Sequence, residues 1–164
     1  MRYILVGSVA ASLYGVDLQP GDLDIAPALA TRNLKNLTSL LLELEAKPST
    51  SGHWEPQPDG EKRWKEDETA LDVEKRTNWT PNPNEVASFD YLFFTRFGNF
   101  DVVPELANPF ERLKERAVPV DAHGQEVRVA HPDDLLSTLT VPRRRKDTAR
   151  VQQLREVQRL RAEG

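Results

Sequence analysis

The sequence predicts an α/β (α+β) protein in which helices flank a mixed, twisted β-sheet and a small C-terminal hairpin and helical region follows. Residues 1–6 form an apolar run that ends at Gly7-Ser8, as a buried strand ending in a turn does. Residues 22–26 alternate between acidic and apolar side chains, which favours a second strand. Leucines at positions 34, 37, 40, 41 and 44 are spaced by three and four, which indicates an amphipathic helix. With 164 residues, the chain is long enough to bury a core without disulfides.

The other elements of the first half connect these three. Residues 9–14 are small and apolar, and Gly15 can end a helix, so a short helix is expected there. The leucine-rich helix is expected over residues 31–47, beginning at Thr31 and stopping before Pro48.

Residues 48–88 form a loop-rich insertion of Pro, Ser, Gly and charged residues. We expect an edge hairpin with long connections, with strands around Arg63 and around residues 70–73. The chain's three tryptophans lie in this insertion: Trp54, Trp64 and Trp79. They are interpreted as core residues or anchors of loops, with stacking on nucleic-acid bases as the alternative.

The second half contains two expected hairpins and three helical segments. The hairpin strands are expected at residues 89–94 with 99–103, and 118–120 with 126–129. The helices are expected at residues 109–117, from residue 132 up to an interruption at Pro142, and at residues 143–162. We therefore divide the chain into a core, residues 1–105, and a C-terminal hairpin and helical region, residues 106–164.

Composition removes several classes of protein. The chain has no cysteine, which excludes a disulfide framework, a zinc ribbon and a thiol nucleophile. No apolar stretch approaches the ~18 residues of a membrane span, and no charged leader precedes an apolar run at the N-terminus. We expect a cytoplasmic protein with no membrane partner.

Charge is unevenly distributed along the chain. Residues 143–164 hold eight Lys/Arg against three Asp/Glu, whereas residues 1–142 hold fourteen against twenty-three. An acidic body with a basic tail does not suit a general DNA-binding protein. The tail fits either a solvated helix face over a packed stripe or a contact surface for phosphates.

Histidine and serine chemistry find little support in the sequence. The three histidines lack the spacing of metal ligands, so His131 is interpreted as a helix-entry residue and His123 as a turn residue. Ser8 lacks placed His and Asp partners, which argues against a hydrolase nucleophile.

Three carboxylates are the strongest candidates for chemistry. Asp22 and Asp24 are separated by one residue on an expected strand, so both side chains project from the same face. Two such charges repel unless a cation lies between them, although paired acids on a strand are also common as solvated surface. Asp101 is the single charge of another apolar strand, and the three together could hold two Mg²⁺ ions, with Mn²⁺ as a substitute.

The Gly7-Ser8 turn would complement these acids. Glycine allows a ligand to approach the backbone closely, and the Ser8 hydroxyl adds a hydrogen-bond donor for a phosphate. Taken alone, such a turn is commonly only a turn.

The order of these motifs resembles a known superfamily. Gly7-Ser8 followed by Asp22-Leu23-Asp24 is similar to the G-[SG]-x(9–13)-D-x-[DE] signature of the nucleotidyltransferases of the DNA polymerase beta-like fold. The sequence around these residues most resembles the minimal prokaryotic branch, which includes toxins of the AbiEii and MenT types. Asp101 resembles its third carboxylate, and Arg145, Lys146 and Asp147 resemble an R-x-K-D-like element of its C-terminal helical part.

The resemblance implies a nucleotidyltransferase fold and a metal-dependent activity. Two Mg²⁺ ions would be bound by Asp22, Asp24 and Asp101. The NTP would be bound by Gly7, Ser8, Arg145, Lys146 and Asp147. A lysine common in the toxin branch near residue 132 is absent, and Arg143 to Lys146 could replace its charge.

The acceptor of the nucleotide is less narrowly implied. A tRNA 3′ end is the first expectation, with the protein acting as the toxin of a toxin–antitoxin system and binding a cognate antitoxin. AMP transfer to a protein hydroxyl is the second, and a small aminoglycoside-type acceptor the third. The competing class is a non-catalytic antitoxin or partner-binding module.

Overall fold

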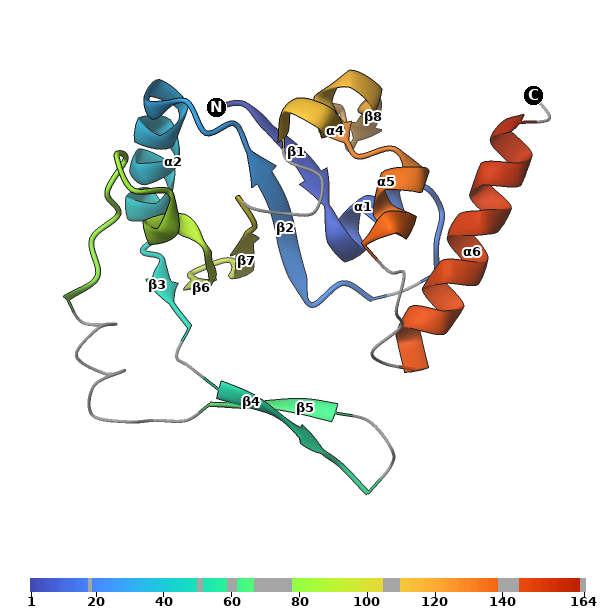
Figure 1. The fold of residues 1–164 in the computed structure, drawn as a ribbon, viewed down its shortest axis with the longest axis horizontal. Helices are drawn as coiled ribbons and strands as arrows, with labels where there is room; N and C mark the ends of the chain where they lie inside the picture. Colours follow the sequence, from blue (N-terminus) through green and yellow to red (C-terminus); the bar gives the residue numbers. More distant parts are fainter. Residues whose placement is uncertain are drawn as a thin grey trace.

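The computed structural model describes residues 1–17, 19–49, 52–58, 62–66, 78–104, 110–138 and 145–162. These residues form a mixed α/β fold, as the sequence predicts, built on a seven-stranded sheet in the order β3-β6-β7-β2-β1-β9-β8 (Figure 1). The strands of that sheet are β1 (Tyr3–Val6), β2 (Asp22–Pro27), β3 (Lys47–Pro48), β6 (Tyr91–Thr95), β7 (Gly98–Val102), β8 (Val118–Ala122) and β9 (Gln125–Val129). The helices are α1 (Gly7–Leu13), α2 (Thr31–Glu43), η1 (Val86–Phe89), α4 (Phe110–Arg116), α5 (Pro132–Ser137) and α6 (Arg145–Ala162).

The sheet mixes parallel and antiparallel pairs. β1 is antiparallel to β2, and β2 is parallel to β7. Both expected hairpins form, as the antiparallel pairs β6–β7 and β8–β9. The β8–β9 hairpin joins the large sheet through β9, which runs parallel to β1. The C-terminal region therefore shares its sheet with the first half, and the division at residue 105 stays a prediction.

Two helices end in the same hydrogen-bonded motif. After α1, Gly15 has φ +89°, and the Val16 N–H donates to the Ala11 carbonyl at 3.2 Å. After α2, Glu45 has φ +53°, and the Ala46 N–H donates to the Leu41 carbonyl at 2.9 Å. This left-handed termination satisfies the last helical carbonyls.

The end of α2 corrects one prediction. The helix was expected to extend to residue 47, but the left-handed turn ends it at Glu43. Lys47–Pro48 instead forms strand β3, which pairs with β6 at the edge of the large sheet.

The loop-rich insertion contains a hairpin that differs from the expected edge hairpin: the strand expected around Arg63 forms, but it pairs with residues 52–56 in a separate two-stranded sheet. Its strands are β4 (Gly52–Pro56) and β5 (Lys62–Glu66). The strand expected at residues 70–73 lies outside the described residues. Trp79 donates from Nε1 to the Ser88 carbonyl at 3.1 Å, and its ring lies 5.0 Å from that of Phe93. These contacts confirm that Trp79 anchors a loop.

One face of the sheet belongs to the core. At alternate positions of three strands, side chains are buried in one hydrophobic cluster with the α2 leucines. These side chains are Ile25 on β2, Phe100 and Val102 on β7, and Phe93 on β6. Their neighbours in sequence point to the opposite face, because side chains alternate along a strand. That opposite face carries the three aspartates.

Helix α6 packs against the hydrophobic core and against α5. Leu154 is fully buried in the core, and Val157 packs against it, as the expected apolar stripe requires. Gln158 donates to the Asp133 carboxylate at the start of α5, and α5 lies beside α6 in Figure 1. His131 caps α5 by accepting the Asp133 N–H, which confirms it as a helix-entry residue. His123 lies in the β8–β9 turn with φ +55°, also as expected.

Within the described residues, no helix is both long enough and apolar enough to span a bilayer.

Candidate metal centre

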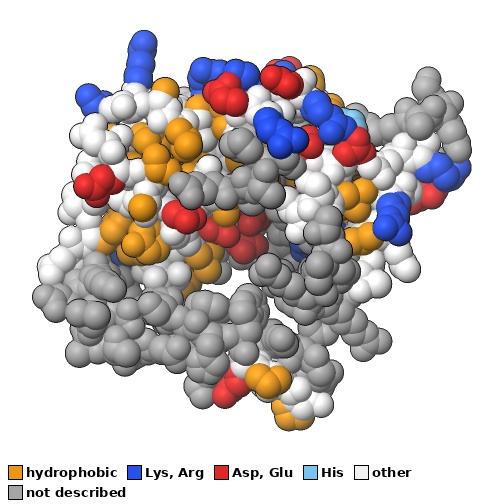
Figure 2. Space-filling view, viewed as in Figure 1, with side chains coloured by type: hydrophobic (Ala, Val, Ile, Leu, Met, Phe, Trp, Pro, Cys, Tyr) orange, Lys and Arg blue, Asp and Glu red, His pale blue; other side chains and the backbone are white. Residues whose placement is uncertain are grey.

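The three predicted carboxylates meet at one point of the large sheet. Asp22 and Asp24 lie on β2, and Asp101 lies on β7, directly opposite Asp24 in the parallel pairing. One carboxylate oxygen from each residue lies within 4.8 Å of the other two. Figure 2 shows a group of acidic side chains near the middle of this face of the molecule.

Burial and the charges of acidic neighbours disfavour the charged forms of Asp24 and Asp101. Burial, followed by the charges of Asp22 and Asp101, raises the pKa of Asp24 to about 7. Burial, followed by the charges of Asp22 and Asp90, raises the pKa of Asp101 to about 6. A cation between the carboxylates would remove much of this penalty.

The backbone of Gly7 fits closely against Asp24. Gly7 has φ +66°, and a Cβ atom on it would overlap the Asp24 carboxylate. The Ser8 N–H donates a hydrogen bond to the same carboxylate. A side chain at position 7 would therefore displace Asp24 as well as strain the backbone.

A cation that sequence analysis did not select completes the surroundings. Arg145, Lys146 and Asp147 form the first turn of α6, and their role in binding the NTP stays a prediction because their side chains lie outside the described part of the structure. Among the described side chains, Arg150, further along that helix, places a positive charge that acts on Asp24. Arg150 precedes the fully buried Leu154 by four residues, so both lie on the same side of α6. That spacing is the only sequence signal that could have singled it out.

Several buried polar atoms around the carboxylates lack a hydrogen-bond partner among the described residues. They are Ser8 Oγ and Asp24 Oδ2, together with Nε of Arg150, whose charge acts on Asp24. A buried polar group without a partner costs about 1–3 kcal/mol, so such groups normally have one. These three atoms fit a site whose groups are completed by a polar, charged ligand.

The donor set suits a hard divalent cation. Three carboxylates supply oxygen ligands, which Mg²⁺ and Mn²⁺ prefer over nitrogen or sulfur. One carboxylate oxygen of each residue lies close enough to the other two to share a single ion. The residues therefore fit a metal ion of this class.

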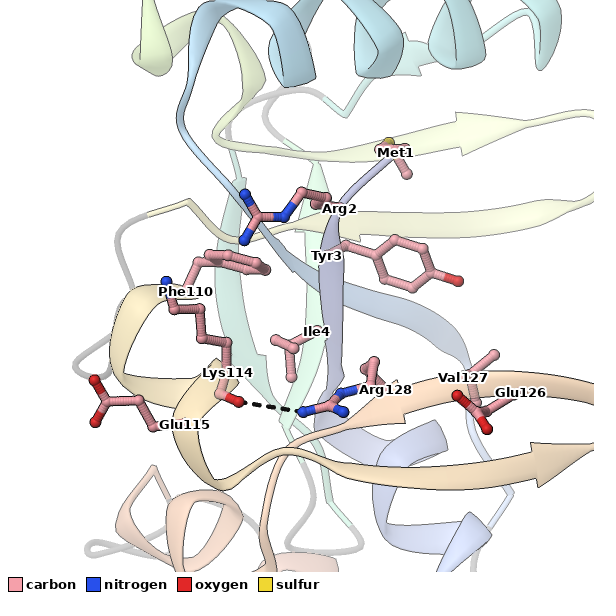
Figure 3. Close-up of a pocket in the computed structure, with 10 residues that line it drawn as sticks. All are labelled: Met1, Arg2, Tyr3, Ile4, Phe110, Lys114, Glu115, Glu126, Val127 and Arg128. Carbon is pink, nitrogen blue, oxygen red and sulfur yellow. Dashed lines mark hydrogen bonds between the residues drawn. The ribbon is translucent and has the colours of Figure 1, made fainter.

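A cavity of about 580 Å³ lies elsewhere, between the start of β1, α4 and β9 (Figure 3). Arg2 lies over the Phe110 ring at 5.3 Å, and Arg128 donates to the Lys114 carbonyl at 3.2 Å. Because β1 ends at Val6, opposite Asp24, the cavity and the carboxylates lie at opposite ends of this strand. The cavity does not include the candidate site.

Comparisons of this chain with protein-family models, with curated proteins and with solved structures find no match.

Proposed function

We propose that this protein is a metal-dependent nucleotidyltransferase that transfers a nucleotide from an NTP to an acceptor hydroxyl, most simply that of a tRNA 3′ end. The observation that carries the proposal is the meeting of Asp22, Asp24 and Asp101 within 4.8 Å on one sheet face. The antitoxin partner and the role as a toxin rest on the motif resemblance of the sequence.

The residues divide into two sets by role. Asp22, Asp24 and Asp101 would hold Mg²⁺, which supplies Lewis-acid stabilisation of the charge on the transferring phosphoryl group. The Ser8 hydroxyl and the Arg150 guanidinium would bind phosphate oxygens, since Ser8 Oγ and Arg150 Nε are buried polar atoms with unused hydrogen-bonding capacity among the described residues.

The reaction is a displacement at phosphorus. The acceptor oxygen forms a bond to the α-phosphorus, the bond from that phosphorus to the bridging oxygen of pyrophosphate breaks, and the hydroxyl proton passes to Asp101. Ser8 and Arg150 hold the pyrophosphate in line with the incoming oxygen. Positioning and charge neutralisation account for most catalysis in such reactions.

A transfer assay tests the proposal. The purified protein is incubated with Mg²⁺ and each α-labelled NTP, with and without total tRNA. Asp24→Asn is the test variant, and Asp17→Asn, an exposed acid on the loop after α1, is the matched control. We expect label on tRNA with the wild type and Asp17→Asn, and none with Asp24→Asn.

The other outcomes separate the remaining activities. Label on protein would replace the tRNA acceptor by a protein hydroxyl. Nucleotide binding without any transfer would contradict the enzymatic role and favour a partner-binding module.

A further inference from the structure

A row of four side chains crosses the large sheet beside the carboxylates. Lys47 on β3 pairs with Phe94 on β6, Phe94 pairs with Asn99 on β7, and Asn99 pairs with Asp22 on β2. Directly paired residues project from the same face of a sheet. Adjacent strands lie about 4.8 Å apart, so this cross-strand row spans about 14 Å from Lys47 to Asp22.

The row lies on the face that the core does not use. On β6, Phe93 is fully buried in the core, whereas its neighbour Phe94 is only half-buried. Lys47 and Asn99 are exposed. Figure 2 shows apolar side chains close to the acidic group on this face.

Each member of the row offers a different interaction. The Lys47 ammonium can pair with a phosphate, the Phe94 ring can stack on a planar group, and the Asn99 amide can both donate and accept hydrogen bonds. An aromatic ring beside an amide matches a nucleobase, which presents a π-face together with donors and acceptors on its edge.

The spacing along β7 places this base-sized surface next to the reacting centre. Asn99 and Asp101 are two residues apart on the same face, about 7 Å along the strand. This separation is comparable to that between a ribose hydroxyl and the far edge of its base. Ser8 directly follows β1, which flanks β2 on the side away from β7, so the Ser8 turn and the cross-strand row lie on opposite sides of the carboxylates of β2.

We propose that the cross-strand row of Lys47, Phe94 and Asn99, ending at Asp22, binds the 3′-terminal nucleotide of a single-stranded RNA acceptor. The base stacks on Phe94, the Asn99 amide contacts its edge, Lys47 pairs with the backbone phosphate, and the terminal hydroxyl faces the carboxylates. The identity of the row's ligand as an acceptor rests on the proposed function, whereas RNA binding by the row does not.

Binding to a labelled RNA tests the row without turnover. Fluorescence anisotropy of a short fluorescein-labelled single-stranded RNA is measured against the full-length Asp24→Asn protein, alone and combined with changes in the row. Phe94→Ala is expected to raise the Kd for RNA about tenfold, since stacking on one base is worth ~1–3 kcal/mol. Lys47→Gln is expected to lower the salt dependence of binding by about one phosphate contact.

Tyr91→Ala is the matched control. Tyr91 is an aromatic residue of the same strand, exposed to 39%, but it pairs with Val102 and so projects from the opposite face. We expect no change in RNA affinity for this variant. Asn99→Ala, at an exposed position, is expected to weaken RNA binding and alter the preference for the terminal base.

The results distinguish the row from the proposed activity. Equal RNA affinities for Phe94→Ala, Asn99→Ala and the unchanged row would overturn the inference, even if nucleotide transfer to tRNA is observed. Weaker binding of a non-hydrolysable NTP by Phe94→Ala with unchanged RNA affinity would also overturn it, because the row would then serve the incoming nucleotide. Loss of RNA affinity without any transfer activity in the wild type would support the row and contradict the proposed function.

Discussion

Replacing Asp24 by asparagine is expected to stabilise the metal-free protein at alkaline pH. The pKa of Asp24 is raised from 3.8 to about 7 by burial and by its acidic neighbours. A folded-state pKa above the unfolded value means that the folded protein binds the proton more tightly. The contribution of the protonated Asp24 to the free energy of unfolding is therefore fully present below pH 3.8 and is lost as the pH rises toward 7.

The size of the effect follows from the pKa shift. A shift of about three pKa units corresponds to ~4 kcal/mol of the free energy of unfolding. Asparagine has the shape of the protonated acid and never ionises. At pH 8 we expect Asp24→Asn to raise the free energy of unfolding by ~2–4 kcal/mol, or the Tm by roughly 4–16 °C for a chain of this size.

Metal should reverse this advantage. Urea denaturation is measured at pH 5 and pH 8, in EDTA and in Mg²⁺, for the wild type, Asp24→Asn and the control Asp17→Asn. We expect Mg²⁺ to stabilise the wild type and Asp17→Asn at pH 8, but not Asp24→Asn. Equal stability of wild type and Asp24→Asn in EDTA at pH 8, or equal stabilisation of both by Mg²⁺, would refute the reasoning.

Two further substitutions test the surroundings of the site, and a third tests a buried group of hydrogen bonds at the start of β1. Gly7→Ala should lower the free energy of unfolding, measured with denaturant, by at least ~1–3 kcal/mol and abolish transfer, because the new Cβ atom overlaps Asp24. A variant as stable as the wild type would contradict the close approach of Gly7 to Asp24. Arg150→Ala should weaken NTP binding about tenfold or more in equilibrium titrations, with partial recovery in Arg150→Lys; an unchanged Kd would remove Arg150 from the site. Asn33→Ala should lower the free energy of unfolding, measured thermally, by ~2–4 kcal/mol. The buried Asn33 amide accepts a hydrogen bond from the Arg2 N–H at 2.6 Å and donates to the Arg2 and Ala28 carbonyls, each at 2.8 Å. A loss below about 1 kcal/mol would contradict this role.

The part of the site that the sequence predicts is local. Asp22 and Asp24 share a face because a strand alternates every residue, and that alternation is visible in five residues of sequence. The place of Asp101 could only be inferred from the motif order. Its position depends on the parallel register of β7 against β2, which joins segments about eighty residues apart and has no local signature.

The residue that helix α6 brings to the site could not be predicted from the sequence either. Every third or fourth residue of the basic C-terminal helix could face the site, and the sequence offers cations on several sides. The burial of Leu154 sets the rotation of α6 and so selects Arg150. The end of α2 was missed for a different reason, because Glu45 adopts the left-handed turn that glycine usually provides.

The association of β9 with β1 was also beyond sequence reasoning. The β8–β9 hairpin was predicted from its turn and alternation, but its parallel docking at Leu5 and Val129 depends on packing between distant segments. As with Asp101, local patterns predicted the strand and left its neighbours undetermined.

Binding of Mn²⁺, followed by electron paramagnetic resonance, tests most directly whether the three carboxylates form a metal centre. Wild-type protein and Asp17→Asn are expected to reduce the signal of free Mn²⁺ and to release the ion when Mg²⁺ is added. Asp24→Asn is expected to leave the free Mn²⁺ signal nearly unchanged. Equal Mn²⁺ binding by wild type and Asp24→Asn, or no binding by either at neutral pH, would contradict a metal centre at Asp22, Asp24 and Asp101.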